Sequence, residues 1–260
     1  MGGVGRPMFR RLVYVWRVWA KWLSFAIFGI GGFLLATLAF PLLRVLFHPK
    51  QRFQQKARQA VSWSLRRFIN VMTLLGIVRL EVEDKKAYQN LRGKIVVANH
   101  PSLLDVVMLI SLIPNADCIV RSNLSKTMVG GVIKQLYILN DLSFERLAED
   151  CLTSLKQGNC IIIFPEGSRT LRNTVPVFKK GAARISMVSG CNIVPVHIGG
   201  TDKYGIGKRD PCTAFNPHDK YVYRLHMKDE LSPQTYLTQP HTLGLRHYNR
   251  ELYQVLVGKG

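Results

Sequence analysis

The chain has 260 residues, 47% of them hydrophobic, so it can bury one sizeable core and still carry an additional segment. Lysine and arginine total 36 against 16 acidic residues, and the net charge of +20 indicates an anionic partner such as phospholipid headgroups, a phosphorylated substrate or nucleic acid. The five cysteines show no C-x-x-C pair and no Cys/His ligand spacing. This pattern argues against a disulfide framework or a zinc site and predicts reduced thiols in a domain that faces the cytosol.

An uncharged apolar stretch covers residues 22–43 and has about the length needed to cross the hydrocarbon core of a bilayer. Basic residues flank both of its ends. The positive-inside comparison therefore does not decide between a membrane span and a re-entrant or interfacial anchor. We predict that residues 1–50 form a membrane anchor with basic flanks and that residues 51–260 form the main domain.

Two other interpretations of this stretch are open. A cleaved signal peptide is one, because Thr37-Leu38-Ala39 resembles a cleavage site, but the apolar stretch is longer than the usual signal sequence. A wholly buried core helix is the other. It is disfavoured because three tryptophans cluster at the charged edge of the stretch, as at a membrane interface; they are Trp16, Trp19 and Trp22.

The next segment, residues 51–75, carries basic side chains between apolar ones at helical spacing, which predicts an amphipathic helix on a membrane surface or in the domain. Beyond it, short apolar runs alternate with helical stretches. This order predicts an α/β fold with a mixed, largely buried sheet and crossover helices. The predicted strands are 78–82, 94–98, 117–120, 160–164, 193–198 and 220–226. The predicted helices are 103–112, 144–157, 180–188 and 243–257.

The first candidate site is the segment N-H-P-S-L-L-D at residues 99–105. A predicted strand ends at residue 98, a turn presents His100, and a helix begins after Ser102. Open α/β folds place their sites at the carboxyl ends of strands. If the chain folds back, Asp105 can fix the tautomer of His100 and stabilise the imidazolium, so the pair can act as a general base.

Asp105 also has a structural interpretation, because S-L-L-D at residues 102–105 fits the S-x-x-D pattern of a helix capping box. The spacing is also easily obtained by accident, since His197 and Asp202 show the same H-x-x-x-x-D separation. Taken alone, the pair of His100 and Asp105 fits a capping role as well as a catalytic one.

The second candidate site is the turn after the predicted strand at 160–164, with the sequence F-P-E-G-S-R. Pro165 ends the strand, Gly167 allows a tight turn, and Arg169 can offer two parallel donors to a phosphate. These features predict an anion cradle. The alternative is a solvent-exposed turn with an internal ion pair between Glu166 and Arg169.

Together these segments resemble the glycerolipid acyltransferases typified by 1-acylglycerol-3-phosphate acyltransferase. The resemblance rests on NHPSLLD, FPEGSR, F-K-K-G-A at 178–182 and I-V-P-V at 193–196, and covers roughly residues 75–200. It implies that residues 51–260 are an acyltransferase catalytic domain, with His100 as general base and Asp105 as its orienting partner. It also implies that the site for a phosphorylated acceptor is lined by Glu166, Gly167, Ser168 and Arg169.

One segment departs from the family pattern. Family members usually carry an arginine that helps to hold the acceptor phosphate, and here Leu142 stands where it is expected. Lys126 is a candidate for compensating. An acceptor with a different headgroup, such as a lyso-aminolipid, therefore stays open beside lysophosphatidic acid.

The resemblance implies transfer of a fatty acyl group from acyl-CoA or acyl-carrier protein to a lysophospholipid hydroxyl, without a metal or other cofactor. We expect the enzyme on a lipid bilayer, at the plasma (inner) membrane with its catalytic domain in the cytosol, and no nucleic acid partner. A serine hydrolase is the first rival, but the chain contains no G-x-S-x-G elbow. A non-catalytic membrane-binding or nucleic-acid-binding protein is the second, and is disfavoured because the motifs lie at strand ends.

Overall fold

A computed structural model describes residues 5–127, 130–140 and 143–258 of the chain. Its centre is a seven-stranded sheet of order β1-β7-β6-β2-β5-β3-β4. Strands β6 and β7 pair antiparallel, and the other neighbouring strands pair parallel. The predicted mixed α/β fold is therefore confirmed. The strands are β1 Val78–Val82, β2 Ile95–Ala98, β3 Ala116–Val120, β4 Ile138–Leu139, β5 Cys160–Ile163, β6 Ile193–Gly200 and β7 Tyr221–Met227.

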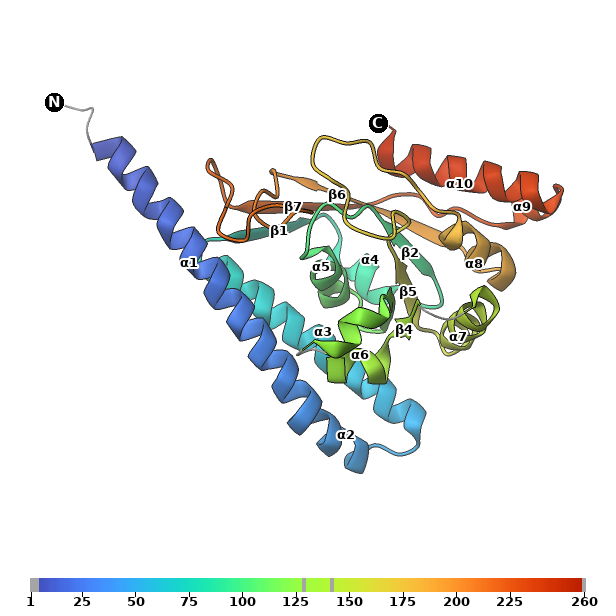
Figure 1. The fold of residues 1–260 in the computed structure, drawn as a ribbon. Coiled ribbons are helices and arrows are strands. Elements are labelled where there is room, and N and C mark those ends of the chain that lie inside the picture. The colour runs from blue at the N-terminus through green and yellow to red at the C-terminus, as the bar shows by residue number, and fades with distance from the viewer. Residues whose placement is uncertain (1–4, 128–129, 141–142, 259–260) are drawn as a thin grey trace.

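Helices cover both faces of this sheet, as Figure 1 shows. In β2, Val96 and Ala98 join a core with α1, α3 and α5, whereas Ile95 and Val97 join a second core with α7, α8 and α10. This alternation follows from the period of two in a strand. Beyond the N-terminal region the helices are α4 Lys85–Asn90, α5 Asp105–Leu112, η2 Ser122–Lys126, α6 Gly130–Leu136, α7 Phe144–Lys156, α8 Gly181–Ser189, α9 Gln234–Leu237 and α10 His241–Val257.

The N-terminal region is a long helix that turns back on itself. Helix α1 (Gly5–Leu34) passes through the π-helical turn η1 (Leu35–Ala39) into α2 (Phe40–Leu46). After a short turn, α3 (Lys50–Leu74) returns beside them, as Figure 1 shows. The part from Met8 to Leu46 is long and apolar enough to cross a membrane, and 11% of its apolar window is buried in the protein.

Helix α1 is nevertheless bound tightly to the rest of the fold. The side chain of Lys21 is fully buried, and its Nζ donates to the carbonyl oxygens of Cys212 at 2.6 Å and Ala214 at 2.5 Å. The indole Nε1 of Trp16 donates to the carbonyl oxygen of Leu75 at 3.0 Å. The predicted division at residue 50 therefore separates segments of the sequence, while packing continues across it.

A buried ion pair joins α3 to the sheet. The Nε and Nη2 atoms of Arg58 donate to the two carboxylate oxygens of Asp117 in β3, at 2.5 and 3.0 Å. The hydroxyl of Ser154 in α7 also donates to Asp117, and Asn159 donates to Ser154 at 3.1 Å. The carboxylate therefore connects helices on both faces of the sheet.

We predict that Asp117→Ala destabilises the protein by about 3–5 kcal/mol, because it leaves the guanidinium of Arg58 buried without a counter-charge. Chemical unfolding followed by circular dichroism measures the change. Arg146→Ala is the control: it removes an ion pair with Glu149 whose side chains are 66% and 69% exposed, so the expected change is within about 0.5 kcal/mol. Equal stability losses in the two variants would contradict the prediction.

Candidate active site at the carboxyl ends of β2 and β5

The two predicted motif segments meet at one edge of the sheet. Strands β2 and β5 are parallel neighbours, with Val97 opposite Ile163, so the turns that follow them lie side by side. Two hydrogen bonds join these turns: the backbone N–H of His100 donates to Glu166 Oε1, and the backbone N–H of Thr170 donates to the His100 carbonyl, both at 3.0 Å. The turn that carries His100 is therefore fixed in position by the other.

His100 and Asp105 form the expected pair. Nδ1 of His100 lies 2.8 Å from Oδ2 of Asp105, whose side chain is fully buried, whereas the His100 side chain is 16% exposed. The imidazole stacks on the ring of Phe164, with centroids 4.2 Å apart. Because the carboxylate faces Nδ1, a neutral imidazole carries its proton there and presents Nε2 as the base.

The capping interpretation of Asp105 also holds, because the same carboxylate accepts from the backbone N–H of Ser102 at 2.7 Å. Helix α5 begins at Asp105, two residues later than predicted, since the residues before it form this turn. The two roles are compatible: the carboxylate that holds the turn also holds the imidazole.

The second H-x-x-x-x-D pair does not form. Nδ1–H of His197 donates to the carbonyl of Leu256 in α10 at 3.0 Å, and Asp202 accepts from Arg172 at 2.5 Å. Asn99, which the sequence analysis did not select, bonds to the backbone N–H and carbonyl of Ile198 at 2.7 and 3.0 Å. It thereby fixes the end of β2 to β6, directly before His100.

In the FPEGSR turn, Glu166 and Arg169 bind different parts of the fold. Glu166 accepts from the backbone of His100 and from the hydroxyl of Thr170, so its carboxylate positions the turn that carries His100. Burial raises the pKa of Glu166. Arg169 Nη1 donates to the carbonyls of Ile206 and Gly207 at 3.1 and 2.9 Å. Within the described residues, Glu166 and Arg169 form no ion pair with each other.

A cavity of about 1090 Å³ opens beside His100. Its lining is mainly apolar and includes side chains of α1, α3 and α5; polar side chains from the turns also line it, and we call this polar part its mouth. Gly167, Ser168 and Arg169 line it, and Gly167 adopts a left-handed φ of 68° that favours glycine. The apolar wall includes Ile27, Phe28, Leu35, Phe68, Val106 and Ile110.

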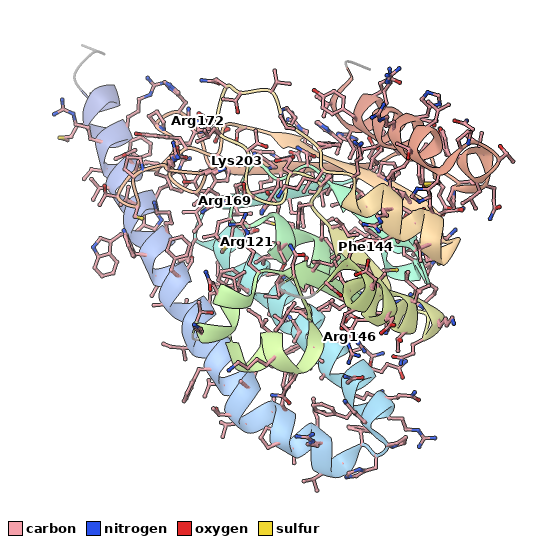
Figure 2. All side chains as sticks on the ribbon, turned by 45° about the vertical axis from the view of Figure 1, so that its right-hand side comes forward. Arg121, Phe144, Arg146, Arg169, Arg172 and Lys203 are labelled. Atoms are coloured by element: carbon pink, nitrogen blue, oxygen red, sulfur yellow. The ribbon has the colours of Figure 1, made fainter. Side chains whose placement is uncertain are left out.

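Three further basic residues lie around Gly167 and Ser168 at the mouth of this cavity, and the sequence analysis missed them. Arg121 Nη2 donates to the carbonyl of Gly167 at 2.8 Å, and Lys208 Nζ donates to Ser168 Oγ at 3.0 Å. Nζ of Lys179 lies 3.1 Å from where a Cβ on Gly167 would stand. Figure 2 labels Arg121 and Arg169 between helices α1 and α8. In the sequence, the F-K-K-G-A segment was the available signal for Lys179.

Two residues bear on the arginine that is missing from the family pattern: Leu142, which stands in its expected place, and Lys126, the candidate for compensating. Leu142 lies outside the described residues. Lys126 is exposed on η2, and it does not belong to the described set of cavity-lining residues.

The five cysteines are free thiols. Burial raises the pKa of Cys118 and Cys151 to about 12 and that of Cys160 to about 11, so these three are un-ionised near neutral pH. In the part of the chain that the structure describes, no group of three or more His, Cys, Asp or Glu side chains is placed to hold a metal ion.

Comparison with known proteins identifies related chains. Residues 79–199 match the family described as Acyltransferase. The chloroplast 1-acyl-sn-glycerol-3-phosphate acyltransferase of Arabidopsis thaliana is 30% identical over 117 residues, which cover 42% of this chain and 32% of that protein. The human 1-acyl-sn-glycerol-3-phosphate acyltransferase beta is 26% identical over 145 residues, or 52% of this chain and 50% of the relative. The chain thus spans about a third to a half of these two curated relatives.

A solved structure shows the same fold. The 1-acyl-sn-glycerophosphate acyltransferase PlsC of Thermotoga maritima superposes with a TM-score of 0.68 and 21% identity, covering 94% of this chain and 95% of the other. The matched family region contains both motif turns and the strands that carry them. Residues 79–199 thus match the Acyltransferase family, the sequence is similar to 1-acyl-sn-glycerol-3-phosphate acyltransferases, and the chain has the fold of PlsC.

Proposed function

We propose that the protein transfers a fatty acyl group from an acyl thioester to the hydroxyl of a lysophospholipid, with His100 as general base. The observation that carries the proposal is the His100–Asp105 pair, 2.8 Å apart, beside a large apolar cavity with a basic mouth. The relatives named above are acyltransferases that act on 1-acyl-sn-glycerol-3-phosphate, which supports this substrate class.

The reaction needs one proton acceptor and no acyl-enzyme. The acceptor hydroxyl attacks the thioester carbonyl while Nε2 of His100 takes its proton, and Asp105 stabilises the resulting imidazolium. A new C–O ester bond forms and the C–S bond breaks. The thiolate of CoA or of acyl-carrier protein leaves, and the proton on His100 returns to the thiolate or to solvent.

The cavity suits both parts of such substrates. Its apolar wall can hold an acyl chain, and a phosphate can bind the cationic side chains at its mouth. Among the described residues, the hydrogen bonds of Arg169 use only Nη1, so Nε and Nη2 can still donate to an anion. A lyso-aminolipid acceptor is the alternative, motivated by Leu142 at the position where the family resemblance leads us to expect an arginine.

The N-terminal helix supports a location on the membrane. Large apolar side chains on its outer face are exposed, including Trp19 at 69% and Phe33 at 53%. Burying these side chains in lipid would bring the cavity, which α1 helps to line, to the place where acceptor and acyl chain reside. We propose the inner (plasma) membrane, with the cavity open to the cytosol.

We expect His100→Ala to lower the rate of acyl transfer by roughly two to four orders of magnitude, which is the usual contribution of a general base. The assay follows labelled acyl-CoA and lysophosphatidic acid by lipid mass spectrometry. His197→Ala is the matched control. Among the described residues, the one hydrogen bond of the His197 imidazole goes to the carbonyl of Leu256 in α10, away from His100. An inactive His197→Ala together with an active His100→Ala would refute the assignment.

Arg169→Lys tests the anion site. It keeps the charge but loses the planar donor fork, so we expect the KM for the acceptor to rise about tenfold and the KM for the donor to change little. Arg172→Lys is the control, since Arg172 pairs with Asp202 outside the cavity lining. Similar losses for donor and acceptor would mean that Arg169 only braces the carbonyls of Ile206 and Gly207.

Phe33→Asp tests membrane association. A carboxylate at this exposed site should weaken binding to phosphatidylglycerol vesicles by roughly 2–3 kcal/mol if the helix enters the hydrocarbon region. Vesicle flotation measures the bound fraction. The control is Leu237→Asp, at a 45% exposed leucine of α9, which lies far from α1 in Figure 1. If both variants float like the unaltered protein, the exposed face of α1 is not the membrane contact.

A further inference from the structure

A buried chain of hydroxyl groups leads from Asp105 into the sheet and plays no part in the mechanism above. Ser102 Oγ lies 2.5 Å from Asp105 Oδ1 and 2.7 Å from the hydroxyl oxygen of Tyr223, a residue of β7. The side chains of all three residues are fully buried. Tyr223 lies outside every motif, 121 positions from Ser102 in the sequence.

The direction of these hydrogen bonds follows from the number of protons. An ionised carboxylate can only accept, so the single hydroxyl proton of Ser102 goes to Asp105. Ser102 Oγ must then accept from Tyr223, and the single phenolic proton of Tyr223 is directed at Ser102. Each hydroxyl in the chain therefore strengthens the bond that the next one donates towards the carboxylate.

Lys203 holds the ring of Tyr223 in place. Its Nζ lies 4.6 Å from the ring centroid and donates to the carbonyl oxygens of Val222 at 2.9 Å and of Thr201. A cation over an aromatic face favours that ring position. Burial lowers the pKa of Lys203 to about 8 and raises the pKa of Tyr223 well above its usual value, so the phenol keeps the proton that it donates.

We propose that Tyr223 is a positioning residue for catalysis: through Ser102 it holds the Asp105 carboxylate in the orientation that binds Nδ1 of His100. This inference rests on the proposed function, because it requires His100 to be the base. Loss of the phenolic hydroxyl would remove the hydrogen bond that Ser102 Oγ accepts and so weaken the hydrogen bond that Ser102 donates to Asp105. The carboxylate and the imidazole would then sample orientations unsuited to proton transfer, while the substrate-binding mouth would be unchanged.

The test compares two tyrosines of the same strand. Tyr223→Phe should lower kcat roughly three- to thirtyfold, the effect expected for one lost buried hydrogen bond, with the KM of donor and acceptor unchanged within about twofold. Tyr221→Phe is the matched control. Tyr221 is equally buried in β7, but its hydroxyl donates to the carbonyl of Tyr204 at 2.7 Å, so kcat should stay near that of the unaltered protein.

A second comparison separates positioning from a general loss of structure. Placed in His100→Ala protein, Tyr223→Phe should cause no further loss of the residual rate, because its effect passes through the imidazole. Ser102→Ala removes the hydroxyl that joins Tyr223 to Asp105, so it should lower kcat at least as much. It serves as the test by itself if thermal melting shows that Tyr223→Phe is unfolded.

The outcomes distinguish this inference from the proposed function. An unaltered protein without acyl-transfer activity overturns both. An active protein that needs His100, but in which Tyr223→Phe matches Tyr221→Phe, overturns only the role of Tyr223. The same follows if the loss appears in KM, or if it persists in the His100→Ala background.

Discussion

The buried carboxylate of Asp105 is the constraint on which the site depends. An ionised carboxylate without solvent is tolerated only when its oxygens accept hydrogen bonds, and here the donors are the His100 ring, the Ser102 amide and the Ser102 hydroxyl. All three belong to one turn, so that turn has a single satisfactory conformation. Asn99 fixes the start of this turn by hydrogen bonds to Ile198 in β6. Glu166 fixes it by accepting a hydrogen bond from the His100 amide. The imidazole is thus oriented before any substrate arrives, which is what a general base requires.

One loop, residues 201–220, contacts both helix α1 and the turn that follows His100. Residues 201–220 supply the carbonyls that bind Lys21, and within them Ile206 accepts both from the amide of Leu103 and from Arg169. A charged side chain in the middle of an apolar helix is costly unless its donors are used, and Lys21 uses them on this loop. Helix α1 therefore contributes to the cavity wall and to the support of the turn that follows His100. An anchor that merely tethers an independent enzyme would need neither contact.

The sequence was sufficient wherever a signal is local. Six strands were predicted within one or two residues, because buried parallel strands are continuous apolar runs, and His100 and Asp105 follow from one short segment. The short elements β4, α4 and α6 were missed, since two to seven residues carry no readable period. Long-range pairings were also missed. Nothing near Tyr223 or Arg121 in the sequence indicates that Tyr223 of β7 contacts Ser102 or that Arg121 contacts Gly167. Lys21 was interpreted as a basic flank because hydropathy does not report which side chains are buried.

The partners and burial of the cationic side chains differ between those that hold the fold together and those that we propose bind substrate. Arg58 is buried with a carboxylate, and Lys203 is buried with its donors on carbonyl oxygens. At the cavity mouth, Arg121 and Lys208 donate to a carbonyl and a hydroxyl, and within the described residues neither nitrogen group lies within 4.0 Å of a carboxylate. Like charges gathered around one turn repel each other, and a bound anion relieves that repulsion. In the proposed reaction the headgroup of the acceptor would supply this anion, and its binding beside His100 would direct the adjacent hydroxyl towards Nε2.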